Sequence, residues 1–275
     1  MTLPGRLVLL GHPVAHSLSP RFQNAALRAA AIPLEYEALD VAAESVPGLL
    51  ATLKGQFAAG NVTLPHKGAV AAACARLTAT ASRTGAVNTF WHEEDPRTGP
   101  VLVGDNTDVA GFQWLARSVL GAVPSGTRVA LLGAGGGAAA VCAAVETWPE
   151  AGIVVFARNG QRAALLAARF PGLVTVAPAI EEALAGAHLV VNATPVGLAG
   201  AEMPVAVGLL PGDAAVMDLA YRPGETPWVR AARLAGHRAA DGLEMLLAQG
   251  AEAFERWFGR APDRAAMRAA LVAGT

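Results

Sequence analysis

The chain has 275 residues, enough for one large or two ordinary domains, and 53% of them are hydrophobic, which permits a large core. Its formal net charge is −1, with acidic and basic residues interspersed, so we expect no nucleic-acid partner. The apolar runs 69–75 and 138–145 are too short to cross a membrane, and residues 1–11 do not form a signal peptide. We therefore expect a cytoplasmic protein without a membrane partner.

The first section of the chain alternates short apolar runs with amphipathic stretches. We expect a helix over residues 20–31, with Ser19 as its N-cap and Pro20 at its first position. The other elements predicted here are strands at 7–10, 34–39 and 58–62, a helix at 46–54, a hairpin of 86–91 with 101–104 around the polar turn 93–99, and a helix at 108–120.

From residue 129 onward the alternation of strands and helices becomes regular. The strands predicted there are 129–132, 153–156, 174–176, 189–192 and 215–219, with a helix after the first of them and another at 161–170. Strands that alternate with helices predict a parallel sheet that is covered on both faces. The expected fold class is therefore α/β.

The last segment is predicted to be helical. Its apolar residues follow helical spacing and form one stripe, made of Leu243, Leu246, Leu247, Phe254, Trp257 and Phe258. Gln249 lies off the centre of that stripe. We expect a break at 260–263, before a final alanine-rich helix.

The cysteines and histidines give no sign of a metal site. Cys74 and Cys142 lie in alanine-rich stretches that we expect to be helical, with both thiols buried and reduced. No histidine has metal-ligand spacing with another histidine or with a cysteine. We expect no bound metal.

A glycine cluster follows the predicted strand 129–132 and opens a helix. It has the G-x-G-x-x-G/A pattern of a dinucleotide site, in Gly133, Ala134, Gly135, Gly136, Gly137 and Ala138. The first glycine permits a tight turn, the second lets the backbone approach a pyrophosphate, and the helix N-terminus favours the anion. The other interpretation is a glycine-rich turn without a ligand.

The end of the next strand distinguishes the two nicotinamide dinucleotides. An NAD site has Asp or Glu there to hold the ribose diol, but this chain has Ala157, Arg158 and Asn159, with Arg162 four residues after Arg158. A pair of guanidinium groups suits a dianionic 2′-phosphate in charge and geometry. The sequence therefore favours NADP over NAD, unless the two arginines only belong to a solvated helix start.

Four polar segments of the first section are predicted to meet in a site for a small polyol. They carry neutral donors and acceptors rather than arginine clusters, in residues 16–20, 61–63, 85–89 and 104–108. Taken alone, each segment has a structural interpretation: Ser19 and Asp108 as helix caps, and Asn88 as a turn residue.

Lys67 and Asp108 are the charged pair in these segments. Only two of the 21 basic residues are lysine, Lys54 and Lys67. Arginine stays protonated in proteins, whereas a lysine amine can exchange a proton. Lys67 beside Asp108 is therefore a candidate for proton transfer, and a proton acceptor together with a hydride acceptor is what alcohol oxidation requires.

The chain resembles the shikimate dehydrogenase family over nearly its whole length. The resemblance rests on motifs in the family's order: Ser17-Leu18-Ser19, Asn61 to Lys67, Asn106-Thr107-Asp108, Asn192 to Gly197, Asp218 to Pro223, and Asp241 to Leu246 with Gln249. It implies reversible NADP-dependent reduction of 3-dehydroshikimate to shikimate, in the biosynthesis of chorismate and the aromatic amino acids.

The resemblance also implies a role for individual residues. Lys67 and Asp108 would be the catalytic pair. The substrate would be held by Ser17, Ser19, Asn61, Thr63, Asn88, Asp108, Tyr221 and Gln249. NADP would contact the glycine cluster together with Arg158, Asn159, Arg162, Thr194, Leu219 and Gly242.

The family's organisation implies two domains with a cleft between them. A discontinuous catalytic domain of residues 1–107 and 243–275, with a mostly parallel sheet, would bind the substrate. A Rossmann-type, doubly wound domain of residues 108–242 would bind NADP. The partner would be the small-molecule substrate, and the protein would act as a monomer or a homodimer.

The chain departs from the family pattern at two positions that bear on the cofactor. Many members have Asn-Arg-Thr where this chain has Ala157-Arg158-Asn159, so Ala157 replaces an asparagine and Asn159 replaces a threonine. We therefore expect weaker discrimination between NADP and NAD. A quinate/shikimate dehydrogenase with relaxed cofactor use is therefore an alternative. A non-catalytic sensor that binds the polyol and a nucleotide is a second one, against which Lys67 and Asp108 argue.

Overall fold

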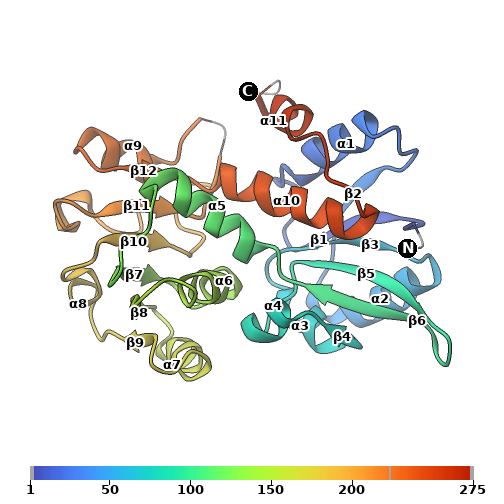
Figure 1. Cartoon of the computed structure of the whole chain (residues 1–275), viewed down its shortest axis with the longest axis horizontal. Coiled ribbons are helices and arrows are strands. Elements are labelled where there is room, and N and C mark those ends of the chain that lie inside the picture. The colour runs from blue at the N-terminus through green and yellow to red at the C-terminus, as the bar shows by residue number, and fades with distance from the viewer. Residues whose placement is uncertain (1–2, 223, 273–275) are drawn as a thin grey trace. The chain divides into compact units, whose positions relative to one another are not determined.

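The computed structural model of the chain describes residues 3–222 and 224–272. It divides into two compact units: Met1–Asp108 with Leu246–Thr275, here called the first unit, and Val109–Met245, the second unit. Each unit contains a six-stranded sheet with helices packed on it (Figure 1). The expected α/β class with two sheets is confirmed.

The sheet of the first unit has the order β2-β1-β3-β5-β6-β4. β1 pairs in parallel with β2 and β3, and β4 with β6, whereas β5 is antiparallel to both of its neighbours. The bounds are β1 Leu7–Gly11, β2 Tyr36–Asp40, β3 Ala59–Val62, β4 Arg76–Leu77, β5 Thr89–Asp95 and β6 Gly99–Asp105. The carboxyl ends of β1, β3 and β6 and the amino end of β5 therefore share one edge.

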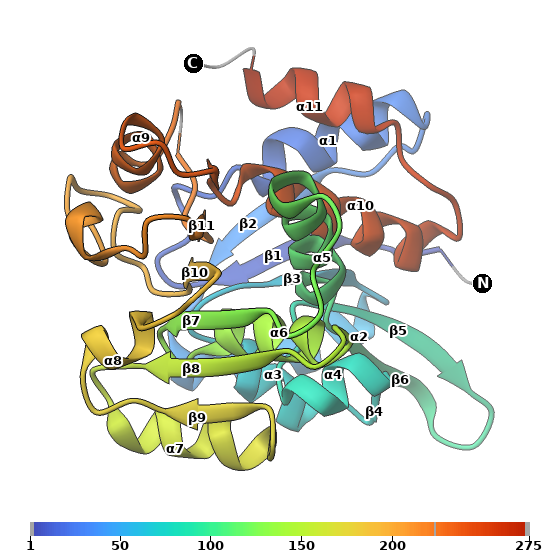
Figure 2. The ribbon, with the colours of Figure 1, turned by 60° about the vertical axis from the view of Figure 1, so that its left-hand side comes forward.

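Successive residues of β1 face opposite sides of this sheet, as its strand geometry requires. Val8 and Leu10 pack in a buried cluster with residues of α2 (Val46–Gly55), α3 (Lys67–Ala73) and α4 (Ala79–Thr84). The other helices of the unit are α1 (Ser19–Ala29), α10 (Leu243–Phe258) and α11 (Arg264–Val272), and α11 lies along α1 (Figures 1 and 2).

α1 and α10 are in close contact. Gln23 Nε2 donates to the carbonyl of Gly250 at 2.9 Å, and a Cβ on Gly250 would lie 2.4 Å from the ring of Phe22. The predicted apolar stripe of α10 is buried at Leu247, Phe254 and Trp257. This contact fixes the helix that also carries Gln249.

The sheet of the second unit is parallel throughout and has the order β12-β11-β10-β7-β8-β9. Its strands are β7 Arg128–Leu132, β8 Gly152–Phe156, β9 Val174–Val176, β10 Leu189–Asn192, β11 Ala215–Asp218 and β12 Ala239–Ala240. This is the doubly wound order, and the chain reverses direction across the sheet between β7 and β10.

Helices cover both faces of this sheet, as the predicted alternation requires. Val129 and Leu131 pack in a buried cluster with α5 (Asp108–Leu120), α6 (Gly136–Val145) and α7 (Gly160–Arg169). Ala130 and Leu132 pack on the opposite face with α8 (Ile180–Leu184) and α9 (Pro227–Leu234).

The N-cap predicted for α1 was wrong. The helix begins one residue earlier than expected, its N-cap is Leu18, and no side chain caps it. Ser17 Oγ accepts from the backbone N–H of Ser19 at 3.2 Å, while the hydroxyl of Ser19 caps no helix. The strand predicted at 86–91 was also too early, because β5 begins at Thr89 and residues 86–88 lie in the connection between α4 and β5.

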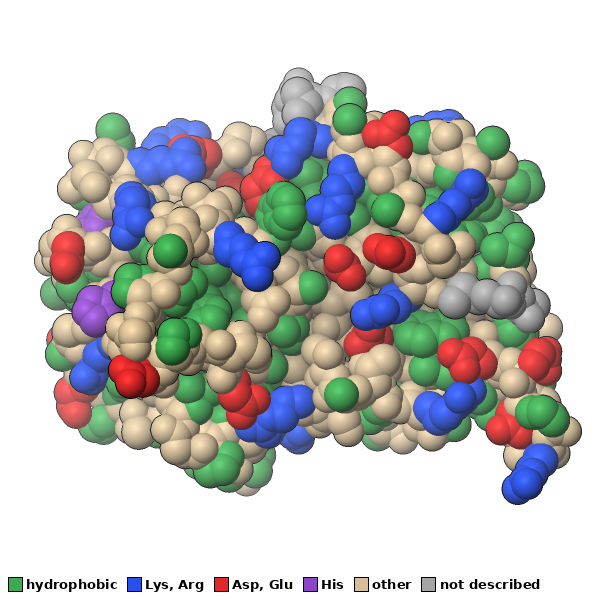
Figure 3. Space-filling view, viewed as in Figure 1, with side chains coloured by type: hydrophobic (Ala, Val, Ile, Leu, Met, Phe, Trp, Pro, Cys, Tyr) green, Lys and Arg blue, Asp and Glu red, His purple; other side chains and the backbone are tan. Residues whose placement is uncertain are grey.

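Cys142 is buried in α6, as expected, but Cys74 is half-buried and follows the end of α3. Burial raises the pKa of the Cys74 thiol to about 12, so this thiol stays protonated at neutral pH. No helix among the described residues is long and apolar enough to cross a membrane. On the face in Figure 3, the described Lys and Arg side chains are interspersed with Asp and Glu.

Candidate active site

The polar segments predicted in the first unit meet at the shared edge of its sheet. Asn61 and Val62 are the last two residues of β3. Asn88 directly precedes β5, and Asp108 lies three residues after the end of β6. Because β5 runs antiparallel to β3 and β6, these three places lie at one end of the strands.

Lys67 and Asp108 form an ion pair at this edge. Lys67 Nζ donates to Asp108 Oδ2 at 2.5 Å, and the two side chains are 16% and 9% exposed. Lys67 is the first residue of α3 and Asp108 the first of α5, where a helix N-terminus favours a carboxylate. An ammonium group has three donors, so two remain for a ligand oxygen.

Asn88 holds the other oxygen of the Asp108 carboxylate. The two hydrogens of its Nδ2 are shared among three acceptors: Asp108 Oδ1 at 2.8 Å, Thr107 Oγ1 at 3.0 Å and Gln249 Oε1 at 3.2 Å. Its Oδ1 accepts from the backbone N–H of Thr107 at 2.7 Å. One buried amide therefore fixes the Asp108 turn and Gln249 of α10 together.

Asn61 is fixed by a separate pair of hydrogen bonds. Its Nδ2 donates to the carbonyl of Asn88 at 3.1 Å, and its Oδ1 accepts from the hydroxyl of Tyr36 at 2.8 Å. The second hydrogen of the Asn61 amide has no partner within residues 3–222 and 224–272, so it can donate to a ligand.

The hydroxyl groups of Ser19 and Thr63 have no hydrogen-bond partner in the described part of the chain. Ser19 is largely buried, and Thr63 follows β3 with a half-buried side chain. Both can therefore bind a ligand, whereas Ser17 Oγ also accepts from the Ser19 backbone. Tyr221 lies in the second unit, after β11, and is not among the residues that the first unit brings together.

The glycine cluster of the second unit has the local geometry of a dinucleotide loop. Gly133 begins the turn after β7 with a φ of +107°, and a Cβ there would lie 2.9 Å from the carbonyl of Ala193. A Cβ on Gly135, the N-cap of α6, would meet nothing within 4 Å, so this backbone is open to a ligand. Ala138 is buried where α6 packs on the sheet.

Arg158, Asn159 and Arg162 stand at the carboxyl end of β8. Asn159 is the N-cap of α7, and its Oδ1 accepts from the backbone N–H of Arg162 at 3.0 Å. Both arginine side chains are exposed, and neither guanidinium has a partner among the described residues. The loop, the helix N-terminus of α6 and these two cations fit a dinucleotide with a 2′-phosphate.

The remaining cofactor candidates, Thr194, Leu219 and Gly242, gather around the ends of β10 and β11. Asn192 Oδ1 accepts from Thr194 N at 3.0 Å and from Thr194 Oγ1 at 2.6 Å. Leu219 N donates to the carbonyl of Asn192 at 2.9 Å. A Cβ on Gly242 would lie 2.4 Å from the carbonyl oxygen of Leu219, so only glycine fits there.

Comparison with known proteins gives the family. The family description "Shikimate dehydrogenase substrate binding domain" matches residues 9–90, and "Shikimate 5'-dehydrogenase C-terminal domain" matches residues 242–272. The chain is 43% identical to a shikimate dehydrogenase (NADP(+)) of Rubrobacter xylanophilus, with 96% of this chain and 94% of the relative covered.

The chain belongs to the shikimate dehydrogenase family.

Solved structures of the family have the same fold over nearly their full length. The shikimate 5-dehydrogenase of Thermus thermophilus, in complex with NADP(H) and shikimate, superposes with a TM-score of 0.84 at 39% identity and covers 97% of this chain and 98% of its own. The quinate dehydrogenase of Corynebacterium glutamicum, in complex with NAD, has a TM-score of 0.85 at 30% identity, with 97% of this chain and 98% of its own covered.

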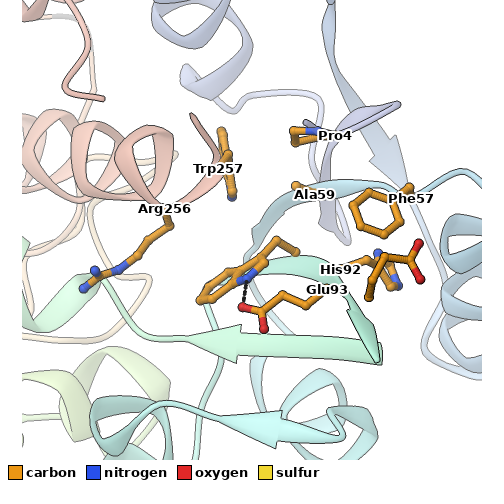
Figure 4. A pocket seen from close by; sticks show the side chains of 9 residues that line it. Pro4, Phe57, Ala59, His92, Glu93, Arg256 and Trp257 are labelled. Carbon is orange, nitrogen blue, oxygen red and sulfur yellow. Dashed lines mark hydrogen bonds between the residues drawn. The ribbon is translucent and has the colours of Figure 1, made fainter. Parts of the chain in front are cut away.

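A hollow of the first unit lies away from Lys67. It has a volume of about 340 Å³ and lies near the amino end of β3, among Phe57, Ala59, His92, Glu93 and Trp257 (Figure 4). It contains none of the candidate site residues of the family. No cluster of His, Cys, Asp and Glu that could hold a metal ion occurs in the described ranges.

Asp218 is a residue that the sequence analysis did not place in the site. It ends β11 with no exposed surface, and its carboxylate accepts from Asn192 Nδ2 at 2.8 Å, Ala220 N at 3.0 Å and Thr226 Oγ1 at 2.8 Å. The motif around Asp218 was recognised, but the sequence does not show which segments its oxygens join.

Proposed function

We propose that this chain catalyses the reversible, NADP-dependent interconversion of 3-dehydroshikimate and shikimate. The observation that carries the proposal is the Lys67–Asp108 pair, 2.5 Å apart and largely shielded from water, among neutral donors and acceptors. The chain's membership of the shikimate dehydrogenase family supports the assignment of substrate and cofactor.

Lys67 is assigned the transfer of the proton to and from the reacting oxygen of the substrate. In the oxidation of shikimate, Lys67 acts in its neutral amine form: its nitrogen accepts the proton of the substrate's C3 hydroxyl group and becomes the ammonium that pairs with Asp108. In the reduction, the ammonium returns that proton to the carbonyl oxygen. Asp108 accepts a hydrogen bond from Lys67 throughout and keeps the nitrogen in place. When bound, the nicotinamide ring supplies the hydride acceptor or donor at C4.

The first unit is assigned the substrate. Ser17, Ser19, Asn61 and Thr63 present hydroxyl and amide groups suited to a carboxylate and to ring hydroxyls, and Asn88 and Gln249 complete the set. The free hydroxyls of Ser19 and Thr63 and the free hydrogen of Asn61 support this assignment. Tyr221 is proposed as a further substrate contact.

The second unit is assigned NADP. The glycine loop from Gly133 to Ala138 would hold the pyrophosphate at the N-terminus of α6, and Arg158 and Arg162 would hold the 2′-phosphate. Asn159 would contact the adenosine ribose, and Thr194, Leu219 and Gly242 the other half of the dinucleotide. The absence of an acidic residue after β8 supports NADP over NAD.

The test is the reduction of NADP⁺ and of NAD⁺ by the purified protein, followed by absorbance with shikimate and with quinate. We expect the highest kcat/KM with shikimate and NADP⁺. A higher value with quinate and NAD⁺ would replace the proposal with a quinate dehydrogenase. No reduction with any of the four pairs, by protein that still binds shikimate, would indicate a sensor.

A further inference from the structure

Two segments of the second unit that carry cofactor candidates meet at one buried carboxylate, which Thr226 also contacts. Asp218 Oδ1 accepts from Asn192 Nδ2 at 2.8 Å and from the backbone N–H of Ala220 at 3.0 Å. Its Oδ2 accepts from Thr226 Oγ1 at 2.8 Å. Asn192, Asp218 and Thr226 have no exposed surface, so water does not compete for these hydrogen bonds.

The first connection leads from Asp218 to Thr194. The amide of Asn192 is oriented by its donation to Asp218, and this turns its Oδ1 toward the backbone N–H and the hydroxyl of Thr194, at 3.0 and 2.6 Å. The hydroxyl of Thr194 in turn accepts from Val196 N at 3.2 Å. Without its acceptor at Asp218, the Asn192 amide keeps only its donation to the Val196 carbonyl at 3.1 Å, so it holds Thr194 less firmly.

The second connection leads from Asp218 to Leu219 and Gly242. The bond from Ala220 N to Asp218 Oδ1 fixes the backbone just after Leu219. Gly242 N donates to the carbonyl of Ala220 at 2.9 Å, and Gly242 packs so closely on Leu219 that a Cβ would lie 2.4 Å from its carbonyl oxygen. Movement of Ala220 therefore moves Gly242.

The topology indicates which half of the cofactor these segments face. A doubly wound sheet binds a dinucleotide with two mononucleotide halves. The half β7-β8-β9 carries the glycine loop and Arg158, which suit the adenosine 2′-phosphate side. The half β10-β11-β12 carries Thr194, Leu219 and Gly242. Because the other half suits the adenosine side, this half is assigned to the nicotinamide side.

We infer that Asp218 is the positioning residue of the nicotinamide half of the cofactor site. It touches neither substrate nor reacting atoms, and it acts by holding Asn192 and Ala220, and through them Thr194, Leu219 and Gly242. The inference rests on the proposed function, because it assigns NADP to the second unit.

The experiment compares two ligands on the full chain by calorimetric or fluorescence titration at pH 8. NADPH occupies both halves of the site, whereas 2′,5′-ADP occupies the adenosine half alone. Asp218→Ala is expected to weaken NADPH binding about tenfold or more, because three hydrogen bonds to a buried group are lost, and to leave 2′,5′-ADP binding within about twofold.

A conservative variant and a control separate positioning from general destabilisation. Asp218→Asn keeps one carbonyl oxygen for Asn192 and Ala220, and the Thr226 hydroxyl can accept from the new amide, so it should recover most of the NADPH affinity. Leu184→Ala removes buried volume from α8, outside this network, so it should lower the unfolding midpoint and leave both affinities unchanged.

If Asp218→Ala does not fold, Asn192→Asp replaces the donor toward Asp218 and is expected to show the same selective loss of NADPH. The double variant Asn192→Asp with Asp218→Asn restores a donor between the two positions and should bind NADPH more tightly than Asn192→Asp alone.

The deciding variant is Asp218→Ala or, where that variant does not fold, Asn192→Asp. The inference is overturned if this variant loses affinity for both ligands equally, or if its NADPH affinity is unchanged. Wild-type protein that binds no NADPH overturns the proposed cofactor as well.

Discussion

The ammonium group of Lys67 lies 2.5 Å from Asp108 Oδ2, and the opposite oxygen of that carboxylate accepts from the Asn88 amide at 2.8 Å. Asp108 is therefore held on both sides within the first unit. This arrangement explains why a lysine is present in a chain whose other basic residues are almost all arginine. It also predicts that the pair is sensitive to its neighbours.

Asn88→Ala should lower both substrate affinity and stability. The substitution leaves Asp108 Oδ1 and the backbone N–H of Thr107 without their buried partner, which costs on the order of 1–3 kcal/mol of unfolding free energy. It also frees Gln249, so KM for shikimate should rise. Denaturant unfolding and steady-state kinetics measure the two effects.

Trp257→Phe is the matched control for this variant. It removes a buried hydrogen bond, from Trp257 Nε1 to Thr89 Oγ1 at 3.0 Å, without touching the Asp108 network. A similar loss of stability with unchanged KM is expected. If Trp257→Phe raised KM as much as Asn88→Ala, the role of Asn88 in holding the substrate would be wrong.

Arg158→Ala and Arg162→Ala should reduce the preference for NADP. A charge-assisted hydrogen bond contributes about 1.5–3 kcal/mol, so each variant should raise KM for NADP⁺ on the order of tenfold to a hundredfold and leave KM for NAD⁺ nearly unchanged. Arg169→Ala, in the last turn of α7, provides a control for the loss of one positive charge. Equal effects on both cofactors would argue against a 2′-phosphate contact.

Asp218→Asn should remove part of the pH dependence of stability. Burial raises the pKa of Asp218 from 3.8 to about 6, so the folded state binds a proton that the unfolded state releases between these two values. The stability that this proton contributes is complete below pH 3.8 and is lost as the pH rises through 6. Burial also raises the pKa of the neighbouring Asp241, which is present in both proteins.

From about pH 5 to about pH 7, the wild type should therefore lose about 1 kcal/mol of unfolding free energy relative to Asp218→Asn. Denaturant unfolding of both proteins at the two pH values measures this difference. A difference that stays constant, or that changes in the opposite direction, would show that Asp218 is already ionised at the lower pH.

Much of the second unit could be predicted from the sequence because local signals suffice there. The run of β-branched residues in β8 and the glycine turn after β7 specify a strand and a strand-to-helix turn without distant partners. The short helix α8 and the two-residue strand β12 were missed, because elements of this length carry too few residues for a periodic pattern.

The candidate site was less accessible to sequence reasoning because its hydrogen bonds join distant segments. Residue types at Lys67, Asn88 and Asp108 could be selected, but the bond from Asn88 to Gln249 spans 161 positions of the chain. Ser19 was expected to cap α1, yet the helix begins earlier and leaves its hydroxyl free. The hydrogen bond between Asp218 and Asn192 depends on the pairing of β10 with β11, which the sequence does not show.

The rate of NADP⁺ reduction by shikimate in Lys67→Ala, with Lys54→Ala as control, tests the central claim most directly. Lys54 is the only other lysine and is exposed on α2. Acid–base assistance contributes about 10²–10⁴-fold, so Lys67→Ala should lose kcat by that factor with a smaller change in KM for shikimate, while Lys54→Ala keeps the wild-type rate. A kcat of Lys67→Ala close to that of the wild type would contradict the account.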